Sequence, residues 1–308
     1  MRKSIISCNV KKFIKSFFIF DFINFIKSFA KQSYINNINT NKAIKLLDFK
    51  KLNQLNLLSY KKSDTLFVLG SGASINTLTE QQWQEIKKSD SIGFNFWCIH
   101  DFVPNMYVFE TPRDKQTALN LFQNFEKKKK HYQNVPSILK DIRTTNLENF
   151  FSISNELAKQ IYIAFDIEMS IERGKHFEKI LRICNYLSKF LFKKGKARLL
   201  FKRRASLSLI THLGYLMGYK KIVLCGVDLN NSKYFYEEKR AYYENKGINV
   251  PNSGQTGGVH STIDPEHNEI TIDQVLLAVN EVLLRPNGTE LYVALNSSAL
   301  HPRLPSYW

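Results

Sequence analysis

Residues 65–74 read TLFVLGSGAS, and this stretch decides the expected fold. The residues between Thr65 and Gly70 are all apolar, as in a strand that is buried on both faces of a parallel sheet. Gly70 and Gly72 then supply a tight turn, and residues 78–90 (LTEQQWQEIKKSD) read as a helix with Thr79 as its N-cap. A strand, a glycine turn and a helix in this order predict the opening of a parallel α/β sheet.

The rest of the chain repeats this alternation of strands and helices. Further strands are expected at residues 91–96, 105–110, 220–228 and 290–295, and helices at 205–219 and 273–288, with a mostly helical and very basic middle at 114–200. The polar stretch at about 229–262 is long for a loop, which is typical of a lid. We therefore expect one α/β domain over residues 61–308, with a mostly parallel, Rossmann-like sheet flanked by helices and a small lid region.

Residues 1–60 are expected to form an N-terminal helical extension. We predict a helix over 1–35, a linker at 36–42 (NNINTNK) and a second helical stretch at 43–60. On a helical wheel one face of the first helix is apolar and the other is rich in lysine; the apolar face holds Phe13, Ile14, Phe17, Phe18, Phe22, Phe25, Ile26 and Phe29. Lysines and an aspartate interrupt the apolar run, so it does not read as a membrane span. Two interpretations stay open: a helix on an anionic membrane surface, or a helix on the protein's own core.

The charge of the chain is strongly positive. Lys and Arg number 44 against 27 Asp and Glu, which gives a net charge of +17. Such a chain favours a polyanion, an anionic lipid surface or an acidic substrate. A basic nucleic-acid-binding protein is therefore one alternative, although no recognisable binding module supports it. The four cysteines have no metal-ligand spacing, and we expect reduced thiols.

The glycine turn and the strand ends carry the first candidate binding residues. Gly70, Ser71, Gly72 and Ser74 lie between a strand and a helix, where backbone N–H groups can receive a phosphate. The third glycine of the dinucleotide fingerprint and the lysine of a phosphate loop are both missing. Ligands of parallel sheets bind outside the carboxyl ends of the strands, and the polar residues expected there are Asn95, Asp228 and Asn230. Turn formation and loop ordering are the competing interpretations of these residues.

A second group of candidates could handle an anion. Arg203, Arg204 and Ser206 precede a helix, and a guanidinium can hold a phosphate or a carboxylate through paired hydrogen bonds. Tyr234 and Tyr236 could donate phenolic hydrogen bonds to a departing phosphate. Unpaired surface arginines and aromatic packing are the alternatives.

One histidine has a catalytic context. His260 lies in TGGVHSTID (residues 256–264), among glycines and hydroxyl residues, and an imidazole can accept a proton from a sugar hydroxyl near neutral pH. A structural role for a lone loop histidine is the alternative. No DxD cluster of the kind that holds a metal on a nucleotide diphosphate is present.

Taken together, these motifs resemble those of the family 42 bacterial sialyltransferases. The resemblance rests on FVLGSGAS at 67–74, on SIGFNF at 91–96, and on RRASLSLITHLGYLMGYKKIVLCGVD at 203–228 with Arg203 and Ser206 in R-x-x-S register. VHSTID at 259–264 and ELYVALNSSAL at 290–300 complete it. It spans roughly residues 65–300 and excludes the first 60. The chain departs from the family pattern at three positions. The family has asparagines where this chain has Ser71 and Thr111, and a phosphate-contacting tyrosine where this chain has Asn230.

The resemblance implies a GT-A-like fold and a glycosyltransferase that moves sialic acid or a related acidic sugar from a CMP donor to a cell-surface glycan, such as a lipooligosaccharide or a capsule. It implies inversion at the anomeric carbon, with no metal and no cofactor. His260 would be the general base, Arg203 and Ser206 would face the sugar, and Tyr236 or Tyr234 would contact the leaving phosphate. CMP would be held by Gly70, Ser71, Gly72, Ser74, Asn95 and Asp228, with Asn230 nearby.

Several alternatives remain open at this point. The donor could carry legionaminic acid, pseudaminic acid or Kdo in place of sialic acid. An enzyme that binds SAM or NAD would use a similar glycine turn, but it should have an acidic residue where Asn95 stands. We expect a cytoplasmic protein peripheral to the inner membrane, without a nucleic-acid partner, and leave a homo-oligomer open.

Overall fold

The computed structural model describes residues 2–171, 174–252, 258–263 and 270–308, with side chains described from Phe18 onward. Within these residues the main sheet has eight strands in the order β1-β6-β5-β4-β3-β2-β9-β10, and every neighbouring pair is parallel. The strands are β1 (Lys50–Lys51), β2 (Thr65–Leu69), β3 (Asp90–Phe94), β4 (Met106–Phe109), β5 (Ser137–Leu139), β6 (Ile161–Ile163), β9 (Lys221–Cys225) and β10 (Glu290–Val293). A separate pair, β7 (Asp166–Glu168) and β8 (Leu200–Lys202), is also parallel. The Rossmann-like parallel sheet that the sequence predicts is confirmed.

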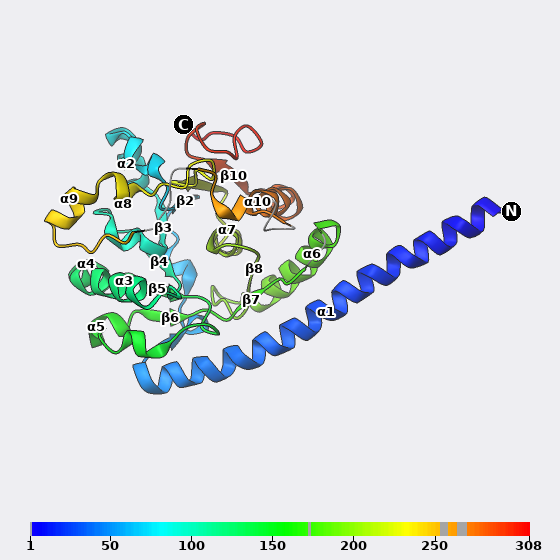
Figure 1. Cartoon of the computed structure of the whole chain (residues 1–308), viewed down its shortest axis with the longest axis horizontal. Coiled ribbons are helices and arrows are strands. Elements are labelled where there is room, and N and C mark those ends of the chain that lie inside the picture. The colour runs from blue at the N-terminus through cyan, green and yellow to red at the C-terminus, as the bar shows by residue number, and fades with distance from the viewer. Residues whose placement is uncertain (1, 172–173, 253–257, 264–269) are drawn as a thin grey trace.

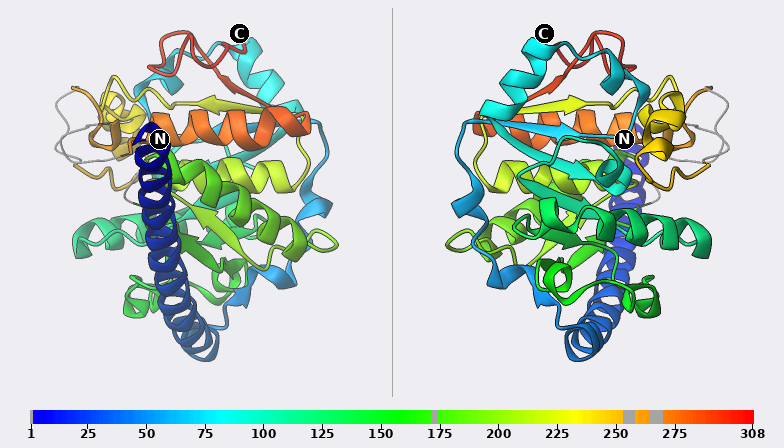
Figure 2. Two further views of the ribbon diagram at one scale, coloured as in Figure 1. Left: turned by 90° about the vertical axis from the view of Figure 1, so that its right-hand side faces the viewer. Right: turned by 90° about the vertical axis from the view of Figure 1, so that its left-hand side faces the viewer.

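Helices cover both faces of this sheet (Figures 1 and 2). They are α1 (Arg2–Leu47), α2 (Glu80–Lys88), α3 (Lys115–Lys127), α4 (Lys129–Tyr132), α5 (Asn155–Ala158), α6 (Gly174–Leu191), α7 (Ser206–Leu216), α8 (Phe235–Glu238), α9 (Arg240–Asn245) and α10 (Ile272–Val279). Because side chains alternate along a strand, Leu66 and Val68 of β2 pack on the side of α6, α7 and α10, whereas Phe67 and Leu69 pack on the side of α2 and α3. The apolar run that the sequence showed is therefore a strand buried on both faces.

The order of the strands reverses beside β2. From β2 the chain builds outward through β3, β4, β5 and β6, and then returns to place β9 and β10 on the other side of β2. In a parallel sheet the loops diverge at such a point and leave a crevice at the carboxyl ends of the strands. The glycine turn after β2 and the loop after β9 lie at this crevice.

The N-terminal extension differs from the expected arrangement. α1 is one continuous helix of 46 residues, so the predicted linker at 36–42 is wrong. The side-chain amides explain this: Gln32 donates to Glu168 O (2.9 Å) and Asn36 donates to Asp166 O (2.7 Å), which satisfies the outer edge of β7. These tertiary hydrogen bonds outweigh the low helix propensity of asparagine. Beyond Leu47 the extension supplies the short edge strand β1 and two short 3₁₀ turns, so the second helical stretch predicted at 43–60 is wrong after the end of α1.

The described part of the apolar face of α1 packs on the protein's own core; the side chains of Phe13, Ile14 and Phe17 lie outside the described residues. Phe25 is 1% exposed, and its ring centroid lies 6.4 Å from that of Phe201 in β8. Phe18, Phe22 and Phe29 pack against the same core. Ile26, predicted to share this face, is instead exposed, together with Ile19, Phe20, Ile23, Tyr34 and Ile38. Figure 1 shows α1 running along the body and beyond it toward the N-terminus. None of the helices in the described residues combines the length and apolar character needed to span a bilayer.

Candidate functional site

The glycine turn is held by the loop after β9. Gly70 N donates to Cys225 O (2.8 Å), and Gly72 N donates to Gly226 O (2.9 Å). A Cβ atom at position 70 would lie 2.6 Å from Gly226 O, so only glycine fits at this close approach. The two loops are thus locked together at the crevice where the strand order reverses.

Asp228 orders this turn. Its Oδ2 accepts a hydrogen bond from Ser74 N (3.0 Å), and its Oδ1 accepts one from the Ser74 hydroxyl. A Cβ atom at Gly72 would lie 2.6 Å from Asp228 Oδ2. Ser74 therefore holds the carboxyl group of Asp228 in place, and Asp228 lines the smaller of the two cavities described below.

Residues 233–235, in the predicted lid, cover the turn. Ala73 N donates to Lys233 O (3.2 Å), and Phe235 N donates to Ser71 O (2.9 Å). This pairing brings the rings of Tyr234 and Tyr236 into a stack, with centroids 5.2 Å apart. Burial raises the pKa of both phenols, so both remain protonated at neutral pH and can donate hydrogen bonds. Residues 253–257 of the predicted lid lie outside the described residues.

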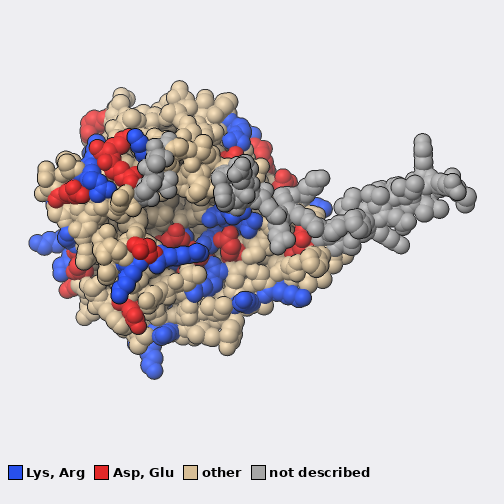
Figure 3. Space-filling model, in the orientation of Figure 1, with Lys and Arg blue, Asp and Glu red and all other residues tan. Residues whose placement is uncertain are grey.

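Two adjoining cavities open at this crevice. The smaller, of about 280 Å³, lies over the glycine turn and the N-terminus of α7. The larger, of about 830 Å³, extends across the ends of β3, β4, β5 and β8. The two share Ser71, Asn95, Glu110, Arg204 and Tyr234 as lining residues. Figure 3 shows basic and acidic side chains side by side around a hollow on this face of the molecule.

Most of the residues predicted from the sequence line these cavities. The smaller cavity has Ser71, Gly72, Asn95, Ser206, Asp228, Tyr234 and His260 in its wall, and Tyr236 joins Ser71, Asn95 and Tyr234 in the wall of the larger. Gly70, Ser74, Arg203 and Asn230 line neither cavity. The first two support the turn, and the other two point elsewhere.

His260 lines the wall of the smaller cavity. Its backbone N donates to Leu229 O (2.8 Å), and its Nδ1 lies 2.9 Å from the hydroxyl oxygen of Thr262. Nδ1 also accepts a hydrogen bond from Thr262 N (3.3 Å), so the neutral ring in this arrangement carries its proton on Nε2. Burial lowers the pKa of His260, so the neutral imidazole is the main form at neutral pH. A neutral imidazole in the wall of a polar cavity can take a proton from a bound hydroxyl group.

Asn95 lies at the boundary between the cavities in a left-handed conformation, with φ of 53°. Its backbone carbonyl accepts a hydrogen bond from the Tyr107 hydroxyl, which holds the turn in place. Its side-chain Oδ1 is buried and has no hydrogen-bond partner within the described part of the chain. A buried polar atom without a partner in the wall of a cavity is suited to a polar group of a ligand.

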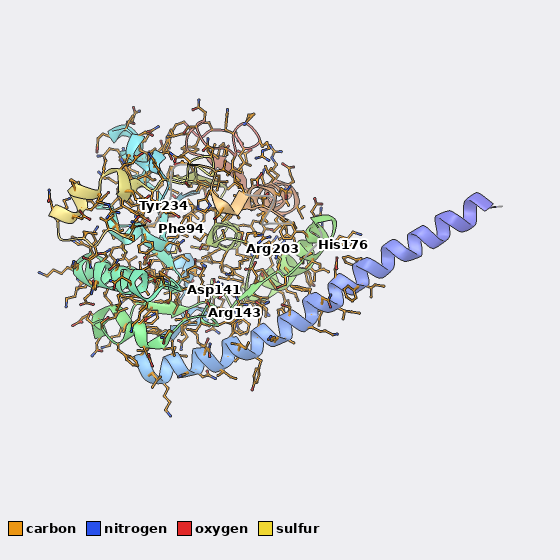
Figure 4. The ribbon with its side chains drawn as sticks, viewed as in Figure 1. Phe94, Asp141, Arg143, His176, Arg203 and Tyr234 are labelled. Carbon is orange, nitrogen blue, oxygen red and sulfur yellow. The ribbon has the colours of Figure 1, made fainter. Side chains whose placement is uncertain are left out.

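Arg203 and Asn230 are the predicted residues that the structure places away from the cavities. Arg203 donates to Ile171 O (2.7 Å), and Figure 4 shows it on the side toward α6. The neighbouring Arg204, with φ of 69°, turns into both cavities instead. Asn230 donates to Ser297 O (3.1 Å) on the exposed surface. The left-handed backbone at Arg204 explains why Arg204 lines the cavities in place of the predicted Arg203. The sequence alone does not reveal this backbone conformation.

Beside and beneath the larger cavity lies a group of charged residues that the sequence analysis missed; all of them line the cavity except Lys140 and Asp166, which are buried below it. We call Glu110, Lys140, Asp141, Arg143, Asp166, Glu168 and Lys202 the charged floor. Asp141 lies at its centre: Lys140 Nζ contacts Asp141 Oδ2 at 2.8 Å, Arg143 Nη2 contacts Asp141 Oδ1 at 2.9 Å, and Lys202 Nζ also contacts Asp141 Oδ2. Figure 4 places Asp141 and Arg143 across the site from Phe94 and Tyr234.

The charged groups of this floor shift one another's pKa values. Burial alone would lower the pKa of Lys140, but Glu110 and Asp141 outweigh it and raise the pKa to about 12. Burial alone would likewise raise the pKa of Asp141, but Lys140 and Lys202 hold it far below its usual range. Among the described residues, no three His, Cys, Asp or Glu side chains gather as ligands for a metal ion. The acidic groups of the floor are instead paired with lysine and arginine.

A parallel sheet with a polar cavity where the strand order reverses is the architecture of α/β proteins that bind nucleotides or sugars. Comparison with protein-family models and with curated proteins finds no match to this chain. Solved structures of two Campylobacter jejuni sialyltransferases do resemble it. The sialyltransferase CstII, in complex with the substrate analogue cytidine-5'-monophosphate, is 15% identical with a TM-score of 0.39, over 79% of this chain and 84% of that chain. The monofunctional alpha-2,3-sialyltransferase Cst-I is 15% identical with a TM-score of 0.43, over 80% of this chain and 82% of that chain.

Proposed function

We propose that this chain is a glycosyltransferase that moves an acidic sugar of the sialic acid type from a CMP donor to a hydroxyl group of a glycan acceptor. The observation that carries the proposal is the position of His260. Although 190 residues separate it from Gly70 in the sequence, it lines the same cavity as Ser71, Gly72 and Asp228. Two of the motifs that carry the sequence resemblance to sialyltransferases thus line one cavity although they are far apart in the chain, and this supports the proposal.

The smaller cavity is suited to the nucleotide. Backbone N–H groups at the start of α7 can receive a phosphate, and Ala205, Ser206 and Leu207 there face the same space as Ser71 and Gly72. Arg204, rather than Arg203, is the arginine that can reach an anionic group there. The sugar of the donor would then extend past Tyr234 and Asn95 into the larger cavity.

The proposed reaction is a direct displacement with inversion. The acceptor oxygen attacks the anomeric carbon as the bond from that carbon to the phosphate oxygen of CMP breaks. The neutral imidazole of His260 takes the proton of the acceptor hydroxyl, and the electron pair of the broken bond stays on the CMP phosphate. The protonated phenols of Tyr234 and Tyr236 donate hydrogen bonds to that developing charge. The proposal includes no metal ion and no cofactor.

The experiment that tests this function measures CMP release from CMP-N-acetylneuraminate, other CMP-nonulosonates and CMP-Kdo, with a mixed glycan acceptor and with or without EDTA. We expect release with at least one donor and no loss on addition of EDTA. Thermal unfolding with CMP, SAM or NADH accompanies it, because a ligand that binds the native state raises the unfolding temperature. Stabilisation by SAM or NADH but not by CMP would refute the proposal in favour of a different enzyme class.

We further propose that α1 holds the enzyme at an anionic membrane surface, near a lipid-linked acceptor. The exposed residues Ile19, Phe20, Ile23 and Ile26 form an apolar stripe on the side of α1 that faces away from the core. The net charge of +17 favours an anionic surface. Deleting residues 1–35 would also remove the buried Phe25, so substitutions on the stripe give a cleaner test.

Phe20→Glu combined with Ile23→Glu is expected to weaken binding to anionic liposomes by about tenfold or more, since each side chain contributes about 1.5–3 kcal/mol when buried. Co-sedimentation with liposomes measures the effect. Phe20 is 58% exposed and Ile23 is 45% exposed, so neither change should disturb the core. Phe151→Glu, at a position 65% exposed beside α5, is the matched control. Equal binding of the double variant and the wild type would show that the stripe does not contact the membrane.

A further inference from the structure

The charged floor is a built surface rather than a group of free charges. Lys140 is 1% exposed and Asp166 is fully buried, and ion pairs link both to neighbours in the floor. Lys202 Nζ lies 3.5 Å from Glu168 Oε2, and Asp141 N donates to Asp166 Oδ1 (2.9 Å). Because these side chains are already held in place, little conformational entropy is lost when a ligand binds to them.

Several polar groups of this region face the larger cavity. The side chains of Glu110 and Glu168 are 42% and 28% exposed, so each carboxylate can accept further hydrogen bonds. Beside them the hydroxyl oxygen of Thr111 is buried and has no hydrogen-bond partner among the described residues. Fixed acceptors, fixed cations and an unsatisfied hydroxyl in one wall match the hydroxyl groups of a sugar ring.

The balance of charge narrows the ligand class. The charged residues that line the larger cavity are three carboxylates, Glu110, Asp141 and Glu168, and four cations, Arg113, Arg143, Lys202 and Arg204. Lys202 and Arg143 already face carboxylates, and the remaining Arg113 and Arg204 share the wall with the partly exposed Glu110 and Glu168, so the net positive charge offered to a polyphosphate is small. The wall instead suits a polyhydroxylated ring with at most one negative charge.

We infer that the charged floor, together with Thr111, is a sugar-binding subsite that is distinct from the nucleotide cavity. This inference rests on the proposed transferase function and deepens it. The ring bound there is either the sugar of the donor or the terminal sugar of the acceptor. Glu110 and Glu168 accept hydrogen bonds from its hydroxyl groups, and Thr111 supplies a further polar contact.

Calorimetric titration of three probes tests the inference: CMP, CMP-N-acetylneuraminate and lactose. Glu168→Gln keeps an acceptor for Arg204 N, which donates to Glu168 Oε1 at 3.0 Å, but it removes the charge. It should weaken sugar binding by about tenfold or more. Thr111→Val removes a hydroxyl without a partner, so it should leave stability unchanged and weaken sugar binding by about twofold to tenfold. Both variants should bind CMP as the wild type does.

Two matched variants control for indirect effects. Thr40→Val also removes a buried hydroxyl that has no partner in the described part of the chain, but on α1 and outside both cavities. Glu281→Gln neutralises an exposed carboxylate paired with Arg285. Neither should affect any of the three probes.

The outcomes separate the subsite from the proposed function. A loss confined to CMP-N-acetylneuraminate relative to CMP assigns the floor to the donor sugar, and a loss confined to lactose assigns it to the acceptor; either supports the subsite. Equal losses for all three probes, or none in either variant, overturn it. Failure of the wild type to bind CMP would overturn the proposed function, and lactose would then decide the subsite alone.

Discussion

Replacing His260 by alanine is expected to lower the rate of sugar transfer by about 10²- to 10⁴-fold, the range that a positioned general base contributes. The nucleotide contacts that we propose come from the glycine turn, Asp228 and the start of α7, none of which depends on the imidazole ring. CMP should therefore raise the unfolding temperature of the variant as it does for the wild type. Single-turnover transfer and thermal unfolding with CMP are the two measurements.

His131→Ala is the matched control for this change, because His131 is exposed on α4 and lines neither cavity. Its turnover should equal that of the wild type. A His260→Ala enzyme that keeps near-normal turnover would refute the assigned mechanism. Loss of CMP stabilisation along with activity would instead assign His260 to binding the nucleotide.

Replacing Lys140 by methionine is expected to destabilise the protein by about 3–5 kcal/mol. Lys140 is 1% exposed, and its ammonium group neutralises both Glu110 and Asp141. Methionine has a similar volume but removes the cation partner of Glu110 and one of the three cations that contact the buried Asp141, and removing one partner of a buried ion pair is costly. Urea unfolding followed by circular dichroism measures the change.

Lys220→Met is the matched control for this second prediction. Lys220 Nζ lies 2.7 Å from Asp64 Oδ2, but its side chain is 69% exposed, so the loss of stability should be much smaller than for Lys140→Met. Similar losses in the two variants would show that burial of Lys140 adds nothing to the strength of its ion pairs. A stable Lys140→Met variant would mean that the floor relaxes and takes in water.

The strands that were predicted from the sequence are those with long apolar runs. β2, β3, β4, β9 and β10 each have four or five residues, and the sequence predicts all five of them. β5, β6, β7 and β8 have only three residues each, and β1 has two, so a periodic pattern cannot identify them. Only pairing with neighbours in the folded sheet defines such short strands, and the middle of the chain was therefore read as mostly helical.

The candidate site divides in a similar way. Motif order was enough to select Ser71, Gly72 and His260, which line one cavity. The charged floor was missed because its members are spread from Glu110 to Lys202 and come together only across the ends of separate strands. Lysines in a chain of such high positive charge gave no sign of which one would be buried.

The long N-terminal helix has a mechanical consequence. At about 1.5 Å per residue, its 46 residues extend about 70 Å. Contacts of Phe25, Gln32 and Asn36 hold α1 against the body, so the helix and the sheet change orientation together. Any surface that covers the outer side of α1 would therefore set the tilt of the cavity mouth relative to that surface.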